Sequence, residues 1–254
     1  MISTSKKTAE SLRALGVREN GLLMVHASLR ALGKIEGGAE TIVRALLDVL
    51  GESGTLLLPA LSYETVTAAN PTFDVRKTPS CVGALPEYFR RREGTVRSIH
   101  PTHSVCAVGA QACELLSGHE NDSTPCGANS PFHKLPHYKG QILFLGCGLR
   151  PNTSMHAIEE LSEPPYLYGD MLEYRITGED GRVIKRSIRG HNFSGWIQRY
   201  ERLAQLLDKN SLRTGKVLDA NCHLIEAAAM WPAAHEKLKE DPLFFVKRGG
   251  NEDG

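Results

Sequence analysis

The sequence lacks an excess of either charge and lacks a long apolar run, and these two absences exclude two kinds of partner. Its 254 residues contain 30 Lys and Arg against 29 Asp and Glu. A chain with so little net charge produces no field that attracts nucleic acid or an anionic lipid surface. No run of about 18 or more apolar residues is present, which a membrane-spanning helix needs. We therefore expect no nucleic-acid partner and no membrane.

The sequence also lacks paired cysteines and a secretion signal. Its six cysteines are scattered, and none forms the C-x-x-C pair that is typical of redox and structural zinc motifs. Residues 1–17 are polar and then amphipathic, without the apolar core of a signal peptide. In a chain of this size these features indicate reduced thiols. We expect a cytoplasmic protein.

The sequence does contain an alternation of apolar patterns. Residues 22–26 and 55–59 are short apolar runs typical of buried strands, and between them residues 42–50 have apolar positions at helical spacing. A strand, a helix and a strand in that order indicate parallel neighbours in one sheet. Further strands are predicted at 105–108 and 141–145. The predicted fold class is α/β, with a central mixed sheet flanked by helices.

The second half of the chain changes to antiparallel patterns. Residues 178–181, Gly-Glu-Asp-Gly, separate two strand-like runs and predict a hairpin. A second hairpin is predicted around Asp219. Helices are predicted at 195–207 and in a last segment that is bent at Pro232. The tail 248–254 is expected to be disordered. These hairpins are late antiparallel additions to the sheet.

The longest segment without periodicity is 63–80, which contains two prolines. A loop of this length in a compact protein is typically functional. No internal repeat, low-complexity tract or linker divides the chain. We therefore expect one domain that spans residues 1–254. Its further helices are predicted at residues 8–15, 83–92 and 155–161, the last with Thr153 or Ser154 as its N-cap.

The strongest chemical pattern follows the strand at 141–145. A Gly-Cys-Gly turn at 146–148 leads to His156, Glu159 and Glu160, and this spacing places both acids on the helix face of the histidine. α/β proteins place their sites at the carboxyl ends of parallel strands. A carboxylate on one imidazole nitrogen fixes the tautomer and makes the other nitrogen more basic. The pattern fits a general base, and fits equally a surface histidine beside two solvated acids.

Two further polar segments also adjoin predicted strands. Residues 26–33, His-Ala-Ser-Leu-Arg-Ala-Leu-Gly, are rich in small residues whose backbone N–H groups can bind an anionic or carbonyl ligand. Residues 97–104 contain two histidines, an arginine and hydroxyls that can bind phosphates through charge-assisted hydrogen bonds. Taken alone, either segment also fits an ordinary polar loop.

A series of short motifs runs through these segments and beyond them. They are Val25-His26-Ala27-Ser28-Leu29, Glu36-Gly37-Gly38-Ala39-Glu40-Thr41, Gly54-Thr55, His100-Pro101, Ala107-Val108-Gly109, Ser130-Pro131 and His156-x-x-Glu159. In order and spacing the series resembles the aminoglycoside 3-N-acetyltransferases over roughly residues 5 to 245. A series is much more specific than any single motif in it. No Q/R-x-x-G-x-G/A pyrophosphate loop of the GNAT superfamily is present, in agreement with the family's own α/β fold.

The resemblance implies an acetyl-CoA-dependent N-acetyltransferase, not of the GNAT fold, that acetylates a primary amine of an aminoglycoside antibiotic or a similar aminated small molecule. It implies direct transfer, with His156 as the catalytic base supported by Glu159. It implies no metal. The residues that it assigns to the acetyl-CoA site are His26, Ser28, Leu29, Arg30, Leu32, Gly33, Arg97, His100, Thr102, His103 and Ser104. Those that it assigns to the amine substrate are Glu64, Asp74, Glu160 and His191.

The chain departs from the family on the acceptor side. Members that confer resistance have an acidic cleft for polycationic aminoglycosides, whereas the long loop here offers only Glu64 and Asp74. Residues 189–193, Arg-Gly-His-Asn-Phe, replace a more acidic stretch, and Arg199 and Tyr200 follow. This version looks like the YokD-type homologues. The acceptor amine therefore stays open, as does the oligomeric state, for which a homodimer would be unsurprising.

Three other interpretations use the same residues differently. A non-catalytic CoA-binding protein of the same fold is argued against by the intact pair of His156 and Glu159. A metal-dependent hydrolase is suggested by the H-x-x-H spacing of His100 and His103, but the context is not H-E-x-x-H and a proline lies between them. Cys147, at a Gly-flanked strand end, could act as a nucleophile, although free cysteines are more often small buried residues.

Overall fold

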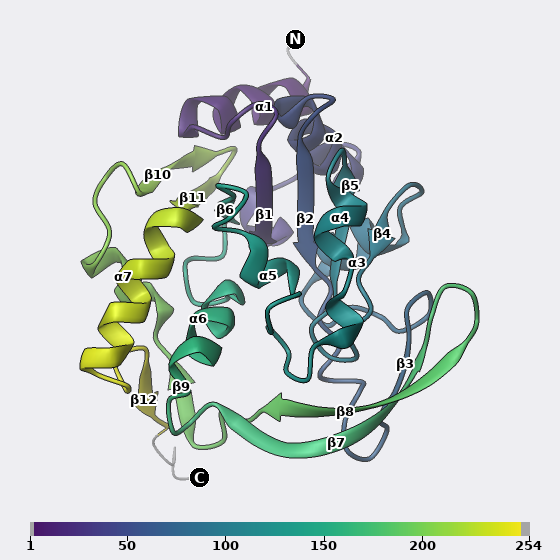
Figure 1. The fold of residues 1–254 in the computed structure, drawn as a ribbon. Helices are drawn as coiled ribbons and strands as arrows, with labels where there is room; N and C mark the ends of the chain where they lie inside the picture. Colours follow the sequence, from purple (N-terminus) through teal and green to yellow (C-terminus); the bar gives the residue numbers. More distant parts are fainter. Residues whose placement is uncertain (1–2, 250–254) are drawn as a thin grey trace, which may run out of the picture.

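The computed structural model describes residues 3–249 and arranges them with helices on both faces of a seven-stranded sheet (Figure 1). The strand order across this sheet is β10-β11-β6-β1-β2-β5-β4. The arrangement confirms the predicted α/β class with a central mixed sheet. The strands are β1 (Leu22–Ala27), β2 (Thr55–Pro59), β4 (Val96–Arg97), β5 (Val105–Gly109), β6 (Gln141–Leu145), β10 (Leu212–Val217) and β11 (Ala220–Glu226).

The centre of the sheet is parallel because a helix returns the chain between its strands. β1 pairs in parallel with β2 on one side and with β6 on the other. All residues of β2 and β6 are buried, as expected of strands that are covered on both faces. The crossover helix α2 (Gly38–Leu50) ends at Gly51, whose φ of 67° lies in the left-handed region that favours glycine. The predicted strand, helix and strand are confirmed.

Successive residues of β1 face opposite helical layers. Leu23 and Val25 pack in one hydrophobic cluster, and Leu22 and Met24 pack in another on the opposite face, because side chains alternate along a strand. The first cluster is covered by α1 (Thr4–Leu15), α2 and α3 (Ala84–Arg91), and the second by α4 (Ala112–Leu116), α5 (Pro131–Lys134), α6 (Ser154–Ser162) and α7 (Ala227–Glu240).

The outer strands of the sheet are antiparallel. β5 runs antiparallel to β2 and to β4, and β11 runs antiparallel to β6 and to β10. β10 and β11 are joined at Leu218 and Asp219, which confirms the hairpin predicted around Asp219. The sheet is therefore mixed, with its parallel strands in the middle.

A long hairpin crosses the end of the molecule toward which β1, β2 and β6 run (Figure 1). It consists of β7 (Tyr168–Thr177) and β8 (Val183–His191), which pair antiparallel and confirm the hairpin predicted around 178–181. β3 (Thr72–Asp74) adds in parallel to β7. The segment 63–80, which was expected to be a loop, thus contributes a strand to this second sheet.

The helix predicted at 195–207 is wrong. This segment contains the strand β9 (Trp196–Gln198) and a 3-10 helix at Tyr200–Gln205. Gly195 has a φ of 76°, which is not a helical value. β9 obtains its backbone hydrogen bonds from β12 (Val246–Arg248) near the end of the chain, and a partner so distant leaves no mark on local periodicity.

The remaining features of the C-terminal part follow the prediction in part. α7 contains Pro232, as predicted. The predicted disordered tail of 248–254 begins too early, because Arg248 belongs to β12, while residues 250–254 lie outside the described part of the chain. None of the helices described is long and apolar enough to cross a membrane. Two further 3-10 helices lie at Leu29–Leu32 and His119–Asn121.

Candidate active site

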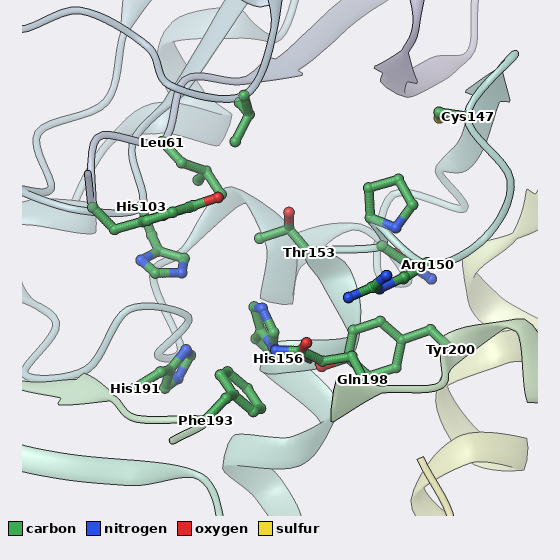
Figure 2. A pocket seen from close by; sticks show the side chains of 14 residues that line it. Leu61, His103, Cys147, Arg150, Thr153, His156, His191, Phe193, Gln198 and Tyr200 are labelled. Carbon is green, nitrogen blue, oxygen red and sulfur yellow. Dashed lines mark hydrogen bonds between the residues drawn. The ribbon is translucent and has the colours of Figure 1, made fainter. Parts of the chain in front are cut away.

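A cavity of about 670 Å³ opens beyond the carboxyl ends of the central parallel strands. Its walls come from the segment after β6, the start of α6 and the segments that follow β2 and β8. Ligands bind at this edge of the sheet in α/β folds. Figure 2 shows that the side chains of His103, His156 and His191 lie around it together with Phe193 and Tyr200.

The first turn of α6 positions His156 at the cavity. Thr153 is the N-cap residue, as predicted, but its side chain makes no capping hydrogen bond and lines the cavity instead. The turn is closed by the backbone, because the N–H of His156 donates to the carbonyl of Thr153 at 3.0 Å. The predicted N-cap position is therefore confirmed, but the Thr153 side chain does not cap the helix.

Glu159 holds one nitrogen of His156. The distance from His156 Nδ1 to Glu159 Oε2 is 2.9 Å, and the side chain of Glu159 is 0% exposed against 12% for His156. A carboxylate oxygen can only accept, so it fixes the proton on Nδ1. The lone pair of His156 is thereby placed on Nε2, the ring nitrogen that Glu159 does not bind.

Two tyrosines complete the shell of Glu159. Tyr200 Oη donates to Oε2 at 2.9 Å, and Tyr166 Oη donates to Oε1 at 2.8 Å. Burial, followed by the charge of Glu159, raises the pKa of both phenols, so both remain donors at neutral pH. A buried carboxylate is costly unless it is hydrogen-bonded, and these bonds meet that need. Periodicity gives no signal for the Tyr200 contact, since Tyr200 is 41 residues from Glu159.

Two further histidines approach His156 from other segments. The ring of His103 lies 5.9 Å and the ring of His191 lies 5.0 Å from that of His156, between centroids, and the two rings are 5.3 Å from each other. Burial lowers the pKa of His103 and of His191 well below the usual value, and the neighbouring histidines add to this effect. Both rings are therefore neutral at pH 7.

Glu160 lies beneath His191 and not on the cavity wall. Its Oε1 accepts from His191 Nε2 at 2.7 Å and from the backbone N–H of Cys126 at 2.8 Å, and its Oε2 accepts from the hydroxyl of Thr124 at 2.6 Å. The side chains of His191 and Glu160 are only 4% and 6% exposed. Burial raises the pKa of Glu160. The structure thus brings both predicted residues to the site, with His191 in front and Glu160 behind it.

The predicted acetyl-CoA loop lies at the end of β1. His26 is buried, its ring stacks on Phe144 with centroids 5.1 Å apart, and burial lowers its pKa to about 3. It borders a small cavity of about 90 Å³ that shares Cys147 and Thr153 with the main one. Among the other predicted residues, Leu32 packs in the core, Ser28, Leu29 and Arg30 are at least partly exposed, and Gly33 has a φ of 81°.

The side chains of Arg97 and Ser104 are buried and form hydrogen bonds within the protein. Every nitrogen of the Arg97 guanidinium donates to protein: Nε to Ser104 Oγ at 2.8 Å, Nη1 to the Thr78 carbonyl at 2.6 Å and Nη2 to the Ala60 carbonyl at 2.8 Å. These bonds tie the 63–80 segment to β5 and its neighbours. The structure gives Arg97 no nitrogen that is free to bind a phosphate.

Hydrogen bonds within the segment from His100 to His103 position the side chain that this segment contributes to the cavity. His100 Nδ1 accepts the backbone N–H of His103 at 2.9 Å, and Thr102 Oγ1 is hydrogen-bonded to His103 Nδ1 at 2.9 Å. Of these three predicted residues only His103 lines the cavity. His100 and Thr102 hold it in place.

The two acids predicted in the long loop do not reach the cavity. Asp74 Oδ1 accepts the backbone N–H groups of Arg76 and Lys77 at 2.9 and 3.0 Å, so it stabilises a local turn. Glu64 is exposed beside Tyr63, whose side chain does line the cavity. Neither acid is among the residues that border the cavity.

Cys147 borders the cavity as a protonated thiol. Burial raises its pKa to about 12, and a thiolate is the form that attacks a carbonyl. We expect Cys147→Ala to keep kcat within about threefold of the wild-type value, because a neutral thiol at this position is a small packing residue. Steady-state thiol release from acetyl-CoA measures this, and loss of all turnover would restore the acyl-enzyme interpretation.

A buried histidine below the site makes folding sensitive to acid. His119 stacks on His100 with centroids 4.8 Å apart, its Nε2 donates to the Pro125 carbonyl at 3.2 Å, and burial lowers its pKa from 6.5 to about 4. Below the ordinary histidine pKa, His119 binds a proton in the unfolded chain but stays neutral in the folded chain. This contribution to stability is therefore present above about pH 6.5 and is lost as the pH falls toward about 4.

We expect His119→Gln to reduce the acid sensitivity of the fold. The difference in free energy of unfolding between about pH 7 and about pH 5.5 shrinks by roughly 1 kcal/mol, since one pKa unit corresponds to about 1.4 kcal/mol. Urea unfolding at the two pH values gives this difference. The exposed His137 supplies the matched control, and His137→Gln leaves the difference unchanged. An equal difference in wild type and His119→Gln contradicts the assignment.

The sequence and the geometry agree with one known family. Residues 24–239 match the sequence profile of the family described as aminoglycoside 3-N-acetyltransferase. The chain belongs to this family. Aminoglycoside N(3)-acetyltransferase III of Salmonella sp. is 31% identical over 250 residues, which cover 88% of this chain and 87% of that one. Aminoglycoside N(3)-acetyltransferase VII of Streptomyces paromomycinus is 35% identical over 179 residues, which cover 64% of this chain and 62% of that one.

Solved acetyltransferases of the family have the same fold. A mutant of aminoglycoside acetyltransferase AAC(3)-IVa in complex with a gentamicin superposes with a TM-score of 0.82 at 27% identity, covering 96% of this chain and 92% of that one. AAC-IIIb in a binary complex with CoASH gives 0.81 at 27% identity, covering 94% and 97%. The YokD protein of Bacillus subtilis shares the fold, with a TM-score of 0.80 at 24% identity and 96% of each chain covered. The chain is therefore an acyltransferase of this family and not a GNAT enzyme.

Proposed function

We propose that this chain transfers the acetyl group of acetyl-CoA directly to a primary amine of an aminoglycoside, with His156 as the general base. The observation that supports this most is the bond from His156 Nδ1 to the buried Glu159, which leaves the Nε2 lone pair for the cavity. Relatives named aminoglycoside N(3)-acetyltransferases and solved family members with CoASH or a gentamicin support the donor and the acceptor.

The transfer then proceeds in two bond changes. The amine nitrogen attacks the thioester carbonyl of acetyl-CoA and gives up a proton to His156 Nε2, while the charge that develops on the imidazole is balanced by Glu159. The C–N bond forms as the carbonyl oxygen becomes an oxyanion, which hydrogen-bond donors of the site stabilise. The intermediate then collapses, the C–S bond breaks, and the departing thiolate of CoA takes the proton from His156.

The donor enters between the β1 loop and the start of α6 in this proposal. The small cavity beside His26 shares its Cys147 and Thr153 walls with the main cavity. A thioester that passes along this shared wall presents its carbonyl to His156. The Ser28–Gly33 loop, at the end of β1, is then the segment beside the pantetheine or the phosphates of CoA.

The lining of the cavity favours a second candidate acceptor. Among the described residues that border it none is an Asp or a Glu, while Arg150 is a cation. An aminoglycoside has several ammonium groups, and a wall without carboxylates gives them no opposite charge. The second candidate is therefore acetyl transfer by the same chemistry to an aminated molecule that has fewer positive charges.

A panel of amines separates the two candidates. Thiol release from acetyl-CoA is followed with aminoglycosides that have or lack the 3-amino group, and with mono-amino sugars. If the first candidate is right, turnover appears only with aminoglycosides that have that amino group. Higher kcat/KM with the mono-amino sugars favours the second. Acetyl-CoA turnover with none of these amines, beside an intact fold, contradicts both.

A further inference from the structure

Three histidines from distant segments converge on one point of the cavity. His103 comes from the loop before β5, His156 from the start of α6 and His191 from the end of β8. Each offers a ring nitrogen, and these nitrogens all lie within 4.8 Å of one another. In Figure 2 the three rings surround a common space. The three histidines are separated by tens of residues in the sequence, and only the fold brings them together.

Two of the rings are held from behind by carboxylates. His156 Nδ1 is bonded to Glu159 at 2.9 Å, and His191 Nε2 is bonded to Glu160 at 2.7 Å. Each carboxylate accepts a hydrogen bond from the N–H of one ring nitrogen, which leaves the lone pair on the other nitrogen. Histidines that bind metals almost always have such an outer partner, which fixes the tautomer and makes the ligand nitrogen more basic.

The third ring is held by a hydroxyl, which can accept a hydrogen bond from the N–H of one ring nitrogen. His103 Nδ1 is hydrogen-bonded to Thr102 Oγ1 at 2.9 Å, and when the hydroxyl accepts, the lone pair of His103 lies on Nε2. The remaining nitrogen of His191, Nδ1, is buried and has no hydrogen-bond partner among the described residues. A buried lone pair without a donor is unfavourable, and a cation placed between the rings satisfies it.

We infer that His103, His156 and His191 bind one divalent transition-metal ion of the zinc type, with a fourth position open to the cavity. Imidazole nitrogens suit Zn²⁺, and three protein ligands with one open position form a common catalytic type of zinc site. Zn–N bonds of about 2.0–2.1 Å in tetrahedral geometry place the ligand nitrogens roughly 3.3 Å apart. The three side chains therefore need to approach one another by no more than about 1.5 Å from the 4.8 Å limit.

A metal ion bound at this site prevents acetyl transfer, because both need the Nε2 lone pair of His156. A lone pair on His156 Nε2 that coordinates a metal cannot take a proton from an amine. Zinc then inhibits the transferase by removing its base, and it inhibits more strongly when the amine concentration is low. This consequence rests on the proposed function, whereas the metal site itself does not.

Metal binding is tested directly on the full chain. The protein is stripped with a chelator and dialysed against Zn²⁺, and bound zinc is counted by elemental analysis. We expect about one ion per chain, and we expect His103→Gln and His191→Gln each to weaken its affinity by more than the roughly 10–100-fold that loss of an outer partner costs. His137→Gln, at an exposed position outside the cluster, keeps the wild-type affinity.

Two measurements do not depend on removing a ligand. Glu160→Gln leaves the three histidines in place and weakens zinc binding by about 10–100-fold, because an amide accepts less strongly than a carboxylate. Co²⁺ bound to the wild-type protein gives the intense visible absorption of a four-coordinate ion. Absence of bound zinc, a pale six-coordinate cobalt spectrum, or zinc affinity that is unchanged in the His103 and His191 variants overturns the site.

The activity assay distinguishes zinc binding at the three histidines from the inhibition that we expect it to cause. Added Zn²⁺ lowers thiol release from acetyl-CoA in wild type, and excess chelator restores it. If one zinc binds but thiol release is unchanged, the exclusion is wrong and the site stands. If zinc binds and no amine is acetylated even by the metal-free protein, the proposed function fails and the site again stands.

Discussion

Replacing His156 by alanine is expected to lower kcat by about 10²–10⁴-fold, the range that a positioned general base contributes. The side chain is the group whose Nε2 lone pair faces the cavity while Glu159 fixes Nδ1. KM for acetyl-CoA is expected to change little, because His156 acts on the amine proton. Steady-state thiol release with the best amine of the panel gives both constants.

The control for this prediction is a histidine that lies outside the cavity. His137 is exposed, and His137→Ala keeps the wild-type kcat. Acetyl-CoA binding to His156→Ala, followed by calorimetry, shows that the fold and the donor site are intact. Turnover of His156→Ala at the wild-type rate contradicts the assignment of the base.

Replacing Glu159 by glutamine is the second large effect that we expect. In the proposed mechanism Glu159 touches no substrate and acts through His156, so it is a positioning residue. An amide no longer supplies a full negative charge beside Nδ1 at 2.9 Å. kcat falls by roughly 10²-fold, less than in His156→Ala because the imidazole is still present. KM for either substrate stays near the wild-type value.

The two tyrosines of this shell provide a matched pair. Tyr200 Oη donates to Oε2 of Glu159 and lies 3.1 Å from Nδ1 of His156, whereas Tyr166 donates to Oε1 of Glu159. Both variants to phenylalanine remove one buried hydroxyl. If the hydrogen bonds around Nδ1 position His156, kcat falls further in Tyr200→Phe than in Tyr166→Phe. Equal losses in both, together with equal losses of stability, point to a purely structural carboxylate.

Local patterns predicted the parts of the fold that depend on neighbours in sequence. β1, α2 and β2 follow from apolar runs and helical spacing that end at Gly51. The pairing of His156 with Glu159 follows from a separation of three residues on one helix face. In each case the residues responsible lie within a few positions of one another, so the local sequence is enough to predict the feature.

The parts that could not be predicted depend on contacts between distant segments. The strand β9 takes the place of a helix because its partner, β12, lies at the end of the chain. The acids of the long loop turn away from the cavity because Asp74 is used in a local turn. The meeting of His103 with His191 follows from the position of the β7-β8 hairpin, which crosses the end of the molecule toward which β1, β2 and β6 run (Figure 1). No spacing rule along the chain indicates it.

The cooperation of His156 with Glu159 is measured most directly by a double-mutant cycle on these two residues. kcat/KM is measured for wild type, His156→Ala, Glu159→Gln and the double variant, with the same amine. If Glu159 acts only through His156, the double variant is no slower than His156→Ala alone, because residues that work as one unit are not additive. Losses that multiply in the double variant mean that the two side chains act independently, and they contradict the proposal of a carboxylate-supported base.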